Sequence, residues 1–271
     1  MSIIQKENFR GSFLMVVAMA TFALEDSVIK LVSSVLPVGQ ILFLLGVGGA
    51  LAFTGLGLIF KKEFFSTGFF SWPMNSRVVS EVIGRVFYSS ALALTPLSSS
   101  TIILQATPLV VVVGAAVLFK ESVTAIRWFA VILGFFGVVI IVDPGSDSFS
   151  FLSILAVLGM LGFASRDLAS RAVPKALNIF ALGLHGFLSI ALSGIVLHLF
   201  NNEPILWPDI SSWLFLLIGI VLGTIGYSAI ISAMRMGEVS AITPFRYSRI
   251  IFGVLIGVFF FEETVTLTSA L

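Results

Sequence analysis

Two arginines and a tyrosine interrupt an otherwise apolar stretch near the carboxyl end of the sequence. From Glu238 to Glu263 it reads EVSAITPFRYSRIIFGVLIGVFFFEE and carries Arg246, Tyr247 and Arg249. At ~1.5 Å per residue, about 22 helical residues cross the roughly 30 Å hydrocarbon core of a bilayer. Arg249 is then expected near the middle of the membrane, where an unpaired charge costs at least ~2.5 kcal/mol.

The chemistry that these residues could perform is the binding of an anion. Arg246 and Arg249 are three residues apart and are expected to share one helix face, which must meet protein or a water-filled cavity. A guanidinium group there would hold a carboxylate or phosphate, with Tyr247 stacking or donating a hydrogen bond. The alternative is a structural ion pair with an acidic residue of another helix. Pro244, one turn earlier, predicts a bend in this helix.

A second set of ionisable residues lies in the predicted third helix. Glu81 and Arg85 are four residues apart in the orientation that favours an ion pair within one helix, and Tyr88 follows on the same face. Their spacing fits a structural pair and a cavity-lining group equally well. Gln105 in the next helix and Tyr227 in the eighth are further candidates for the cavity, or else they make ordinary hydrogen bonds between helices.

Paired ionisable residues also recur in the first and sixth predicted helices. Glu25 and Asp26 point about 100° apart on a helix, so we expect one to meet an arginine while the other titrates and couples transport to protons. The alternative is pairing of both with Lys30, Arg166 or the last helix. Arg166 and Asp167 occupy the matching place in the sixth helix, where an ion pair that acts as a gate or joins a helix interface is expected rather than a binding role.

The composition is that of a polytopic membrane protein. The 271 residues are 58% hydrophobic and 11% charged, with mean hydropathy +1.12, whereas soluble domains carry about 25% charged residues. A net charge of +1 gives no field that favours nucleic acid. The sequence has no cysteine and none of the metalloprotease, nucleophile-elbow or P-loop motifs. No catalytic residue, metal or cofactor is therefore predicted.

Nine apolar segments predict nine transmembrane helices separated by short connections. They cover Phe13–Ser33, Val38–Phe60, Val79–Leu94, Leu97–Phe119, Ala125–Val142, Phe151–Ser170, Ile179–Phe200, Trp213–Ala233 and Val239–Phe261.

The connections alternate in charge. One set holds Lys6, Arg10, Lys61, Lys62, Arg77, Lys120, Arg127, Arg171, Lys175 and Arg235, and the other holds Asp143, Asp147, Glu203, Asp209, Glu262 and Glu263 without any lysine or arginine. The positive-inside rule then predicts a cytoplasmic N-terminus.

An internal repeat emerges when the sequence is aligned with itself. An alignment that places Glu121 on Glu263 also places Phe119 on Phe261, and a shift of a single position in the first helix brings Asp26 onto Asp167. Each unit has five helices, an odd number, so the two units must be inverted in the membrane. We therefore predict an all-α protein of two inverted repeats, 1–142 and 150–271, with the substrate site between them.

The repeat leaves the second unit one helix short. A partner for the fifth helix is expected to end near position 284, beyond Leu271. Either the sequence is part of a longer chain or the protein has nine helices. We favour the first interpretation.

Two segments resemble the EamA-type permeases of the drug/metabolite transporter superfamily, which have ten helices. The first is ALALTPLSSSTIILQATPLVVVVGAAVLFKESVTAIRWFAVILGFFGVVII, with Gln105-Ala106-Thr107-Pro108 at its centre. The second is ITPFRYSRIIFGVLIGVFFFEE, which is similar to bacterial members assigned to S-adenosylmethionine or riboflavin uptake. The resemblance implies the ten-helix fold and a transport function. It leaves the substrate open, because the family moves amino acids, nucleosides, sugars, vitamins and drugs.

The charges expected within the membrane nearly balance: five cations (Lys30, Arg85, Arg166, Arg246, Arg249) against four anions (Glu25, Asp26, Glu81, Asp167). This balance indicates paired gates with one arginine to spare for a substrate carboxylate. We predict a secondary transporter of a small amphipathic or zwitterionic metabolite, such as an amino acid derivative, in the bacterial inner membrane. The alternatives are a drug exporter, a riboflavin-type importer and, more remotely, a channel or intramembrane enzyme. No nucleic-acid partner is expected, and a homodimer is left open.

Overall fold

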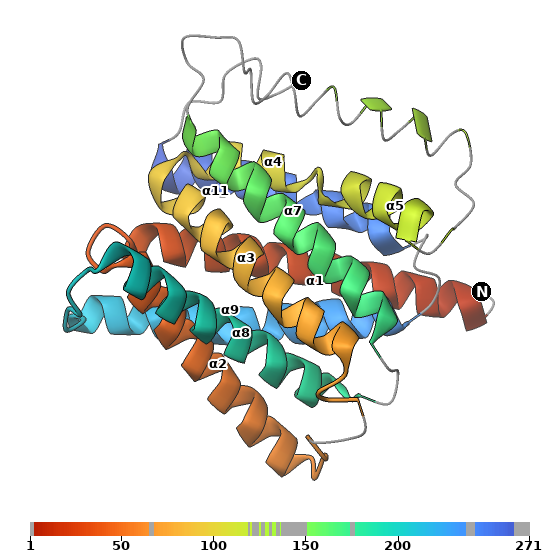
Figure 1. Ribbon diagram of the computed structural model, residues 1–271, viewed down its shortest axis with the longest axis horizontal. Helices are drawn as coiled ribbons and strands as arrows, with labels where there is room; N and C mark the ends of the chain where they lie inside the picture. The colour runs from red at the N-terminus through yellow and green to blue at the C-terminus, as the bar shows by residue number, and fades with distance from the viewer. Residues whose placement is uncertain are drawn as a thin grey trace.

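The computed structural model describes residues 3–64, 68–118, 151–173, 177–236 and 242–262, and single positions between 120 and 136. The regular elements of these residues are helices (Figure 1). They are α1 (Ile3–Val32), α2 (Val38–Ile59), α3 (Trp72–Leu94), α4 (Leu97–Leu104), α5 (Thr107–Leu118), α7 (Phe151–Ala172), α8 (Ile179–Asn201), α9 (Ile210–Arg235), the 3₁₀ helix η1 (Thr243–Tyr247) and α11 (Ser248–Phe261).

Six spans in the described parts are long and apolar enough to cross a membrane, which confirms the all-α polytopic class. Helix α3 has 23 residues but is not among these spans. Its charged residues Arg77, Glu81 and Arg85 lower its hydropathy, although all three are buried by neighbouring helices. The predicted fifth helix, Ala125–Val142, lies largely outside the described residues.

Two predicted helices are interrupted. The predicted helix over 97–119 divides into α4 and α5 at Gln105 and Ala106, and the one over 239–261 becomes η1 followed by α11. The first break has a local cause, because Pro108 has no N–H to donate to the carbonyl of Leu104. The hydroxyl of Thr107 donates to that carbonyl instead. The repeat alignment of Glu121 with Glu263 places this break on the junction of η1 and α11.

The helices pack in pairs that reflect the sequence repeat. The most extensive contacts join α2 to α8, α3 to α7, and α1 to α9. The repeat alignment carries α1, α2 and α3 onto α7, α8 and α9, so the α3–α7 and α1–α9 contacts are equivalent. In Figure 1, α1 starts at the end marked N and α7 runs the opposite way. This pattern accords with the predicted inversion; the division at residues 142 and 150 stays a prediction.

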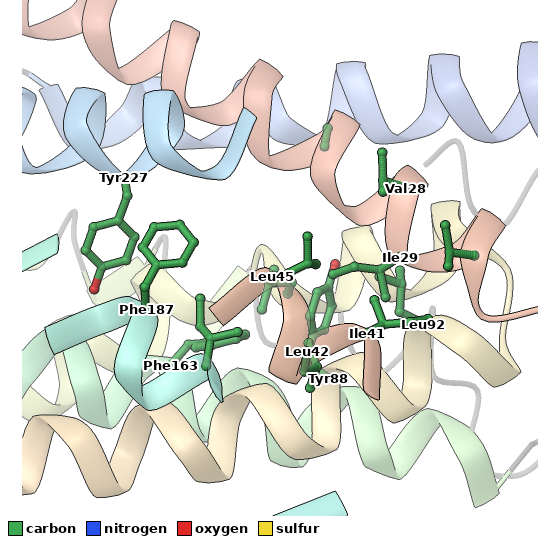
Figure 2. Close-up of a cluster of buried hydrophobic side chains, with 14 of the residues drawn as sticks. Val28, Ile29, Ile41, Leu42, Leu45, Tyr88, Leu92, Phe163, Phe187 and Tyr227 are labelled. Atoms are coloured by element: carbon green, nitrogen blue, oxygen red, sulfur yellow. The ribbon is translucent and has the colours of Figure 1, made fainter. Parts of the chain in front are cut away.

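A buried apolar cluster fills the space between the helix pairs (Figure 2). The rings of Phe187 on α8 and Tyr227 on α9 have centroids 5.7 Å apart, and Phe53 of α2 lies 5.6 Å from Phe187. Tyr88 of α3 is also buried and belongs to the same cluster as Leu42 of α2. These rings form the apolar wall against which the buried charges are held.

Glycines allow the α3–α7 pair to approach backbone to backbone. A Cβ atom added to Gly162 of α7 would collide with both the N and Cα atoms of Gly84. The equivalent α1–α9 contact also uses a glycine, since a Cβ on Gly226 would lie 2.6 Å from the Thr21 hydroxyl. Both crossings therefore depend on the missing side chain.

A single added methyl group tests the crossing. We expect Gly162→Ala to destabilise the protein by about 1–3 kcal/mol, because α3 and α7 must separate to admit it. Gly55→Ala is the matched control, because a Cβ there meets nothing within 4 Å and alanine favours helix over glycine. Thermal unfolding in detergent measures both, and equal midpoints for the two variants would contradict the close crossing.

Candidate functional site

A buried carboxylate on α3 is the centre of the site. Glu81 is 0% exposed and accepts hydrogen bonds from Nη1 of Arg166 on α7, at 3.2 Å to Oε1 and 3.3 Å to Oε2. Arg77, one turn earlier on α3, has its Nη2 3.9 Å from Oε2. Glu81 therefore lies between two guanidinium groups of different helices, which offset its negative charge.

The chain of ion pairs continues from α7 to η1. Arg166 Nη2 lies 2.8 Å from Oδ1 of Asp167, and Nη1 of Arg246 lies 2.8 Å from the other carboxylate oxygen, Oδ2. Arg246, expected to be an anchor for substrate, is thus paired with an acidic residue of another helix. Arg166 and Asp167 thus pair with each other, and their role as a gate stays a prediction.

Arg77 extends this chain to α9. It donates to the Tyr227 hydroxyl through Nη2 and to Ser170 Oγ at 3.1 Å through Nε. The sequence placed Arg77 in a connection, which is wrong, because α3 begins at Trp72 and not at Val79. We refer to Arg77, Glu81, Arg166, Asp167 and Arg246 together as the α3–α7 network.

A second group of paired charges joins α1, α3 and α11. Asp26 accepts hydrogen bonds from Arg249 and, at 3.0 Å, from the Tyr88 hydroxyl. The Arg249 guanidinium lies over the rings of Phe22 and Tyr88, 5.6 Å and 5.9 Å from their centroids. Pairing of Asp26 with the last helix was one of the two expectations for this residue. We call Asp26, Tyr88 and Arg249 the Asp26 cluster.

Two buried charges have no such partner in the part of the chain that the structure describes. Glu25 is 2% exposed and Arg85 is 7% exposed, and neither forms an ion pair with any residue that the structure describes. The ion pair of Glu81 with Arg85, one of the two arrangements that their spacing allows, is therefore not formed in the described helices. Glu81 faces Arg77 and Arg166, whereas the Arg85 guanidinium lies over the ring of Phe163 at 5.7 Å.

The ring of Phe163 lies between the two groups of charges. Arg166 of the α3–α7 network stacks over it at 4.9 Å, and Tyr88 of the Asp26 cluster meets it edge-on at 5.8 Å. Arg85 is thus held on an aromatic surface that both groups share. Sequence reasoning missed Phe163, because nothing distinguishes it from the many other phenylalanines of the chain.

The remaining candidates divide between the interior and the surface. Gln105 is buried, and its Nε2 atom has no hydrogen-bond partner among the described residues. Tyr247 is 39% exposed and lies outside the buried charges. Lys30 donates to the carbonyl of Thr95 at 2.7 Å. Within the described ranges, no three histidine or acidic side chains gather as a metal site would require.

Comparison with known proteins places the chain among membrane transporters. A sequence model of the EamA-like transporter family matches residues 9–143 and 150–271. A riboflavin transporter of Vibrio cholerae is 27% identical over 194 residues, which are 69% of this chain and 62% of that protein. An S-adenosylmethionine uptake transporter of Rickettsia conorii is 24% identical over 181 residues, 66% of this chain and 60% of the relative.

Two further similarities concern an unassigned relative and the fold. An uncharacterized transporter of Helicobacter pylori strain J99 is 30% identical over 190 residues, 65% of this chain and 60% of its own length. The matches thus span about six-tenths of these relatives. A solved crystal structure superimposes with a TM-score of 0.70 over 98% of this chain and 92% of the other, at 20% identity. That likeness shows the fold.

Paired and unpaired charges are expected to differ in their effect on stability. Glu81→Gln removes the ion-pair partner of Arg77 and one of the two ion-pair partners of Arg166, and it should cost about 3–5 kcal/mol. Arg85→Gln removes a charge that forms no ion pair within the described residues, so its effect should be much smaller. Thermal unfolding of both variants in one detergent makes the comparison. An Arg85→Gln variant as unstable as Glu81→Gln would contradict the unpaired state of Arg85.

Proposed function

Because the chain belongs to the EamA-like transporter family, we propose that it is a secondary transporter that moves a small amphipathic or zwitterionic metabolite across the bacterial inner membrane. The proposal places the substrate among the buried charges, with Arg85, Tyr88 and Gln105 lining its site. The α3–α7 network and the Asp26 cluster act as gates on either side. The orientation predicted from the loop charges puts the N-terminus in the cytoplasm.

The observation that carries this proposal is that ion pairs tie helices of one predicted repeat to helices of the other. Glu81 of α3 is bonded to Arg166 of α7, and Asp26 of α1 to Arg249 of α11. Contacts of this kind can break and re-form as one repeat rocks against the other, which is the motion that alternating access requires. Repeats 1–142 and 150–271 are the proposed moving units.

Charges of both signs argue against a channel. A conducting pore needs a continuous polar path lined by one sign of charge or by carbonyl groups. Several cations and anions of the described helices instead lie opposite each other as close pairs, such as Arg246 and Asp167. Paired charges therefore favour a substrate site that opens to one side of the membrane at a time over a continuously open pore.

The second candidate function is riboflavin import. It is favoured by the similarity to the Vibrio cholerae riboflavin transporter and by the buried aromatic rings of Tyr88, Phe163 and Tyr227, which offer stacking surfaces to a flat ring system. Export of drugs or toxic metabolites is a third candidate. The direction of transport is set by the ion to which transport is coupled and by the gradients of that ion and of the substrate.

Flux measurements in proteoliposomes test the transport function. We expect wild-type protein to move at least one metabolite that binds it in a thermal-shift screen, with flux that responds to an imposed pH gradient if Glu25 or Asp26 couples protons. Arg249→Ala should lower flux by at least about tenfold, because it leaves Asp26 buried without its counter-charge.

The control for this variant is Lys62→Gln, which alters an exposed cation at the end of α2. Both proteins should insert equally and elute as single species in detergent. If the Arg249→Ala variant shows wild-type uptake kinetics, the proposed role of Arg249 in transport is contradicted. If no bound metabolite shows flux, the proposed transport function is contradicted.

A further inference from the structure

The loop between α8 and α9 carries large apolar side chains on its surface. Ile205 and Trp207 are 76% and 89% exposed, and Ile210, the first residue of α9, is 82% exposed. We refer to these three residues as the α8–α9 loop patch. Loop side chains that face water are mostly small or polar, whereas a cluster of exposed apolar side chains is typical of a surface that contacts a partner. The kind of partner can be inferred from where the loop lies and how it is held.

A side chain of α2 fixes the conformation of this loop. The buried carboxamide of Gln40 donates to the carbonyl oxygen of Leu206 through Nε2, and its Oε1 accepts from the N–H of the same residue at 3.0 Å. A residue that uses both backbone groups on one partner is paired as in an extended strand, where side chains two positions apart point to the same side. The side chains of Ile205 and Trp207, which flank Leu206, are therefore presented together.

Both ends of the loop are also fixed. Asn202 ends α8 in the left-handed conformation, with φ 49°. Asp209 caps α9, where its carboxylate accepts from the N–H of Ser212 at 2.9 Å. The ring of Trp207 meets that of Trp213, in the first turn of α9, edge-on with centroids 6.4 Å apart. The exposure of the α8–α9 loop patch therefore belongs to a defined loop structure.

The lengths of the flanking helices place the loop at the level of the lipid headgroups. Helices α8 and α9 are both long and apolar enough to span a membrane, with 23 and 26 residues. At ~1.5 Å per residue they are about 35 Å and about 39 Å long, which exceeds the roughly 30 Å hydrocarbon core but not the 40–45 Å of a bilayer with its headgroups. In Figure 1 the loop lies at the end of the bundle opposite the end marked N. This end is the outer face in the orientation predicted from the loop charges.

We propose that the α8–α9 loop patch inserts into the headgroup region of the outer leaflet and binds the ester and upper acyl groups of phospholipids. Tryptophan is favoured at this level because its ring is apolar and its N–H can donate a hydrogen bond. The loop carries Glu203 and Asp209 but no lysine or arginine, so attraction to anionic headgroups does not hold it there. Gln40 is the positioning residue that sets its depth. The inference is independent of the metabolite that the protein carries.

A lipid partner fits this surface better than a second copy of the chain. Exposed apolar side chains continue from the patch into both membrane spans, with Phe200 in the last turn of α8 and Leu214 in the second turn of α9. The patch is thus continuous with surfaces that already face lipid. Two copies joined through this loop would also bring Glu203 and Asp209 of each copy towards those of the other, and like charges repel.

Site-directed spin labelling measures the depth of the loop, and the chain suits this method because its sequence has no cysteine. Ile205→Cys and Ile210→Cys are each coupled to a nitroxide in the full chain, which is reconstituted into vesicles of phosphatidylethanolamine and phosphatidylglycerol. Accessibility of the nitroxide to oxygen, which concentrates in the bilayer, is compared with its accessibility to a water-soluble nickel chelate. The references are Leu217→Cys, at an exposed position within the α9 span, and Lys62→Cys, at the exposed end of α2.

We expect the labels at positions 205 and 210 to favour oxygen over the nickel chelate, as the label at position 217 does, whereas the label at position 62 should favour the chelate. A preference for the chelate at either loop position would overturn the assignment, because the patch would then lie in water. Labels that neither reagent reaches would overturn it too, since a protein surface would then cover the patch.

A second variant tests the role of Gln40. In the Ile205→Cys background, Gln40→Leu should shift the label towards the nickel chelate, because the loop loses both of its hydrogen bonds to α2. Thr54→Val is the matched control on α2, since the Thr54 hydroxyl donates to the carbonyl of Ala50 in the same helix at 2.8 Å, and it should leave the label unchanged. An unchanged label in Gln40→Leu would contradict the positioning role.

Discussion

Burying a charge in a membrane protein is costly unless the charge is matched, and ion pairs match most of the buried charges that the structure describes. Removing one partner of a buried pair costs about 3–5 kcal/mol, because the other is left uncompensated in a medium of low dielectric constant. Glu81 is held by Arg166 of α7, and Asp26 by Arg249 of α11. Helices α3 and α7, like α1 and α11, cannot slide past each other without exchanging these partners. The ion pairs therefore set the helix register and also limit how the protein can move.

The close helix crossings and the charge pairs depend on each other. Gly84 is three residues after Glu81, and Gly162 is four residues before Arg166, so the backbone contact of α3 with α7 lies one turn from their ion pair. The repeat duplicates the crossing but not the charge. The alignment of the two repeats carries Gly84 onto Gly226, whereas Glu81 falls on Gly223. A duplicated crossing in which one copy alone carries this carboxylate fits an asymmetric substrate better than a purely architectural role.

The sequence was sufficient to predict where most of the helices lie, but it did not predict which charged side chains pair with each other. Long apolar runs determine where helices form, and the repeat relates the observed α3–α7 contact to the α1–α9 contact. Spacing along a helix could not choose between Arg77 and Arg85 as the neighbour of Glu81, since both are four residues away. That choice is made by α7, which brings Arg166 and Phe163 to the same face of α3. The break at Gln105 likewise could not be predicted from Pro108 alone. In the structure the Thr107 hydroxyl donates a hydrogen bond to the carbonyl of Leu104, which the proline leaves without its helical donor.

A double-mutant cycle on Asp26 and Arg249 tests the dependence on paired charges most directly. The free energy of unfolding is measured for Asp26→Asn, Arg249→Gln and the double variant in the same detergent. Each single change should destabilise the protein, and the double variant should lose less than the sum of the two by about 0.5–3 kcal/mol, because neither residue is then left alone. Strictly additive losses would show that the pair contributes nothing as a pair, and would contradict the account.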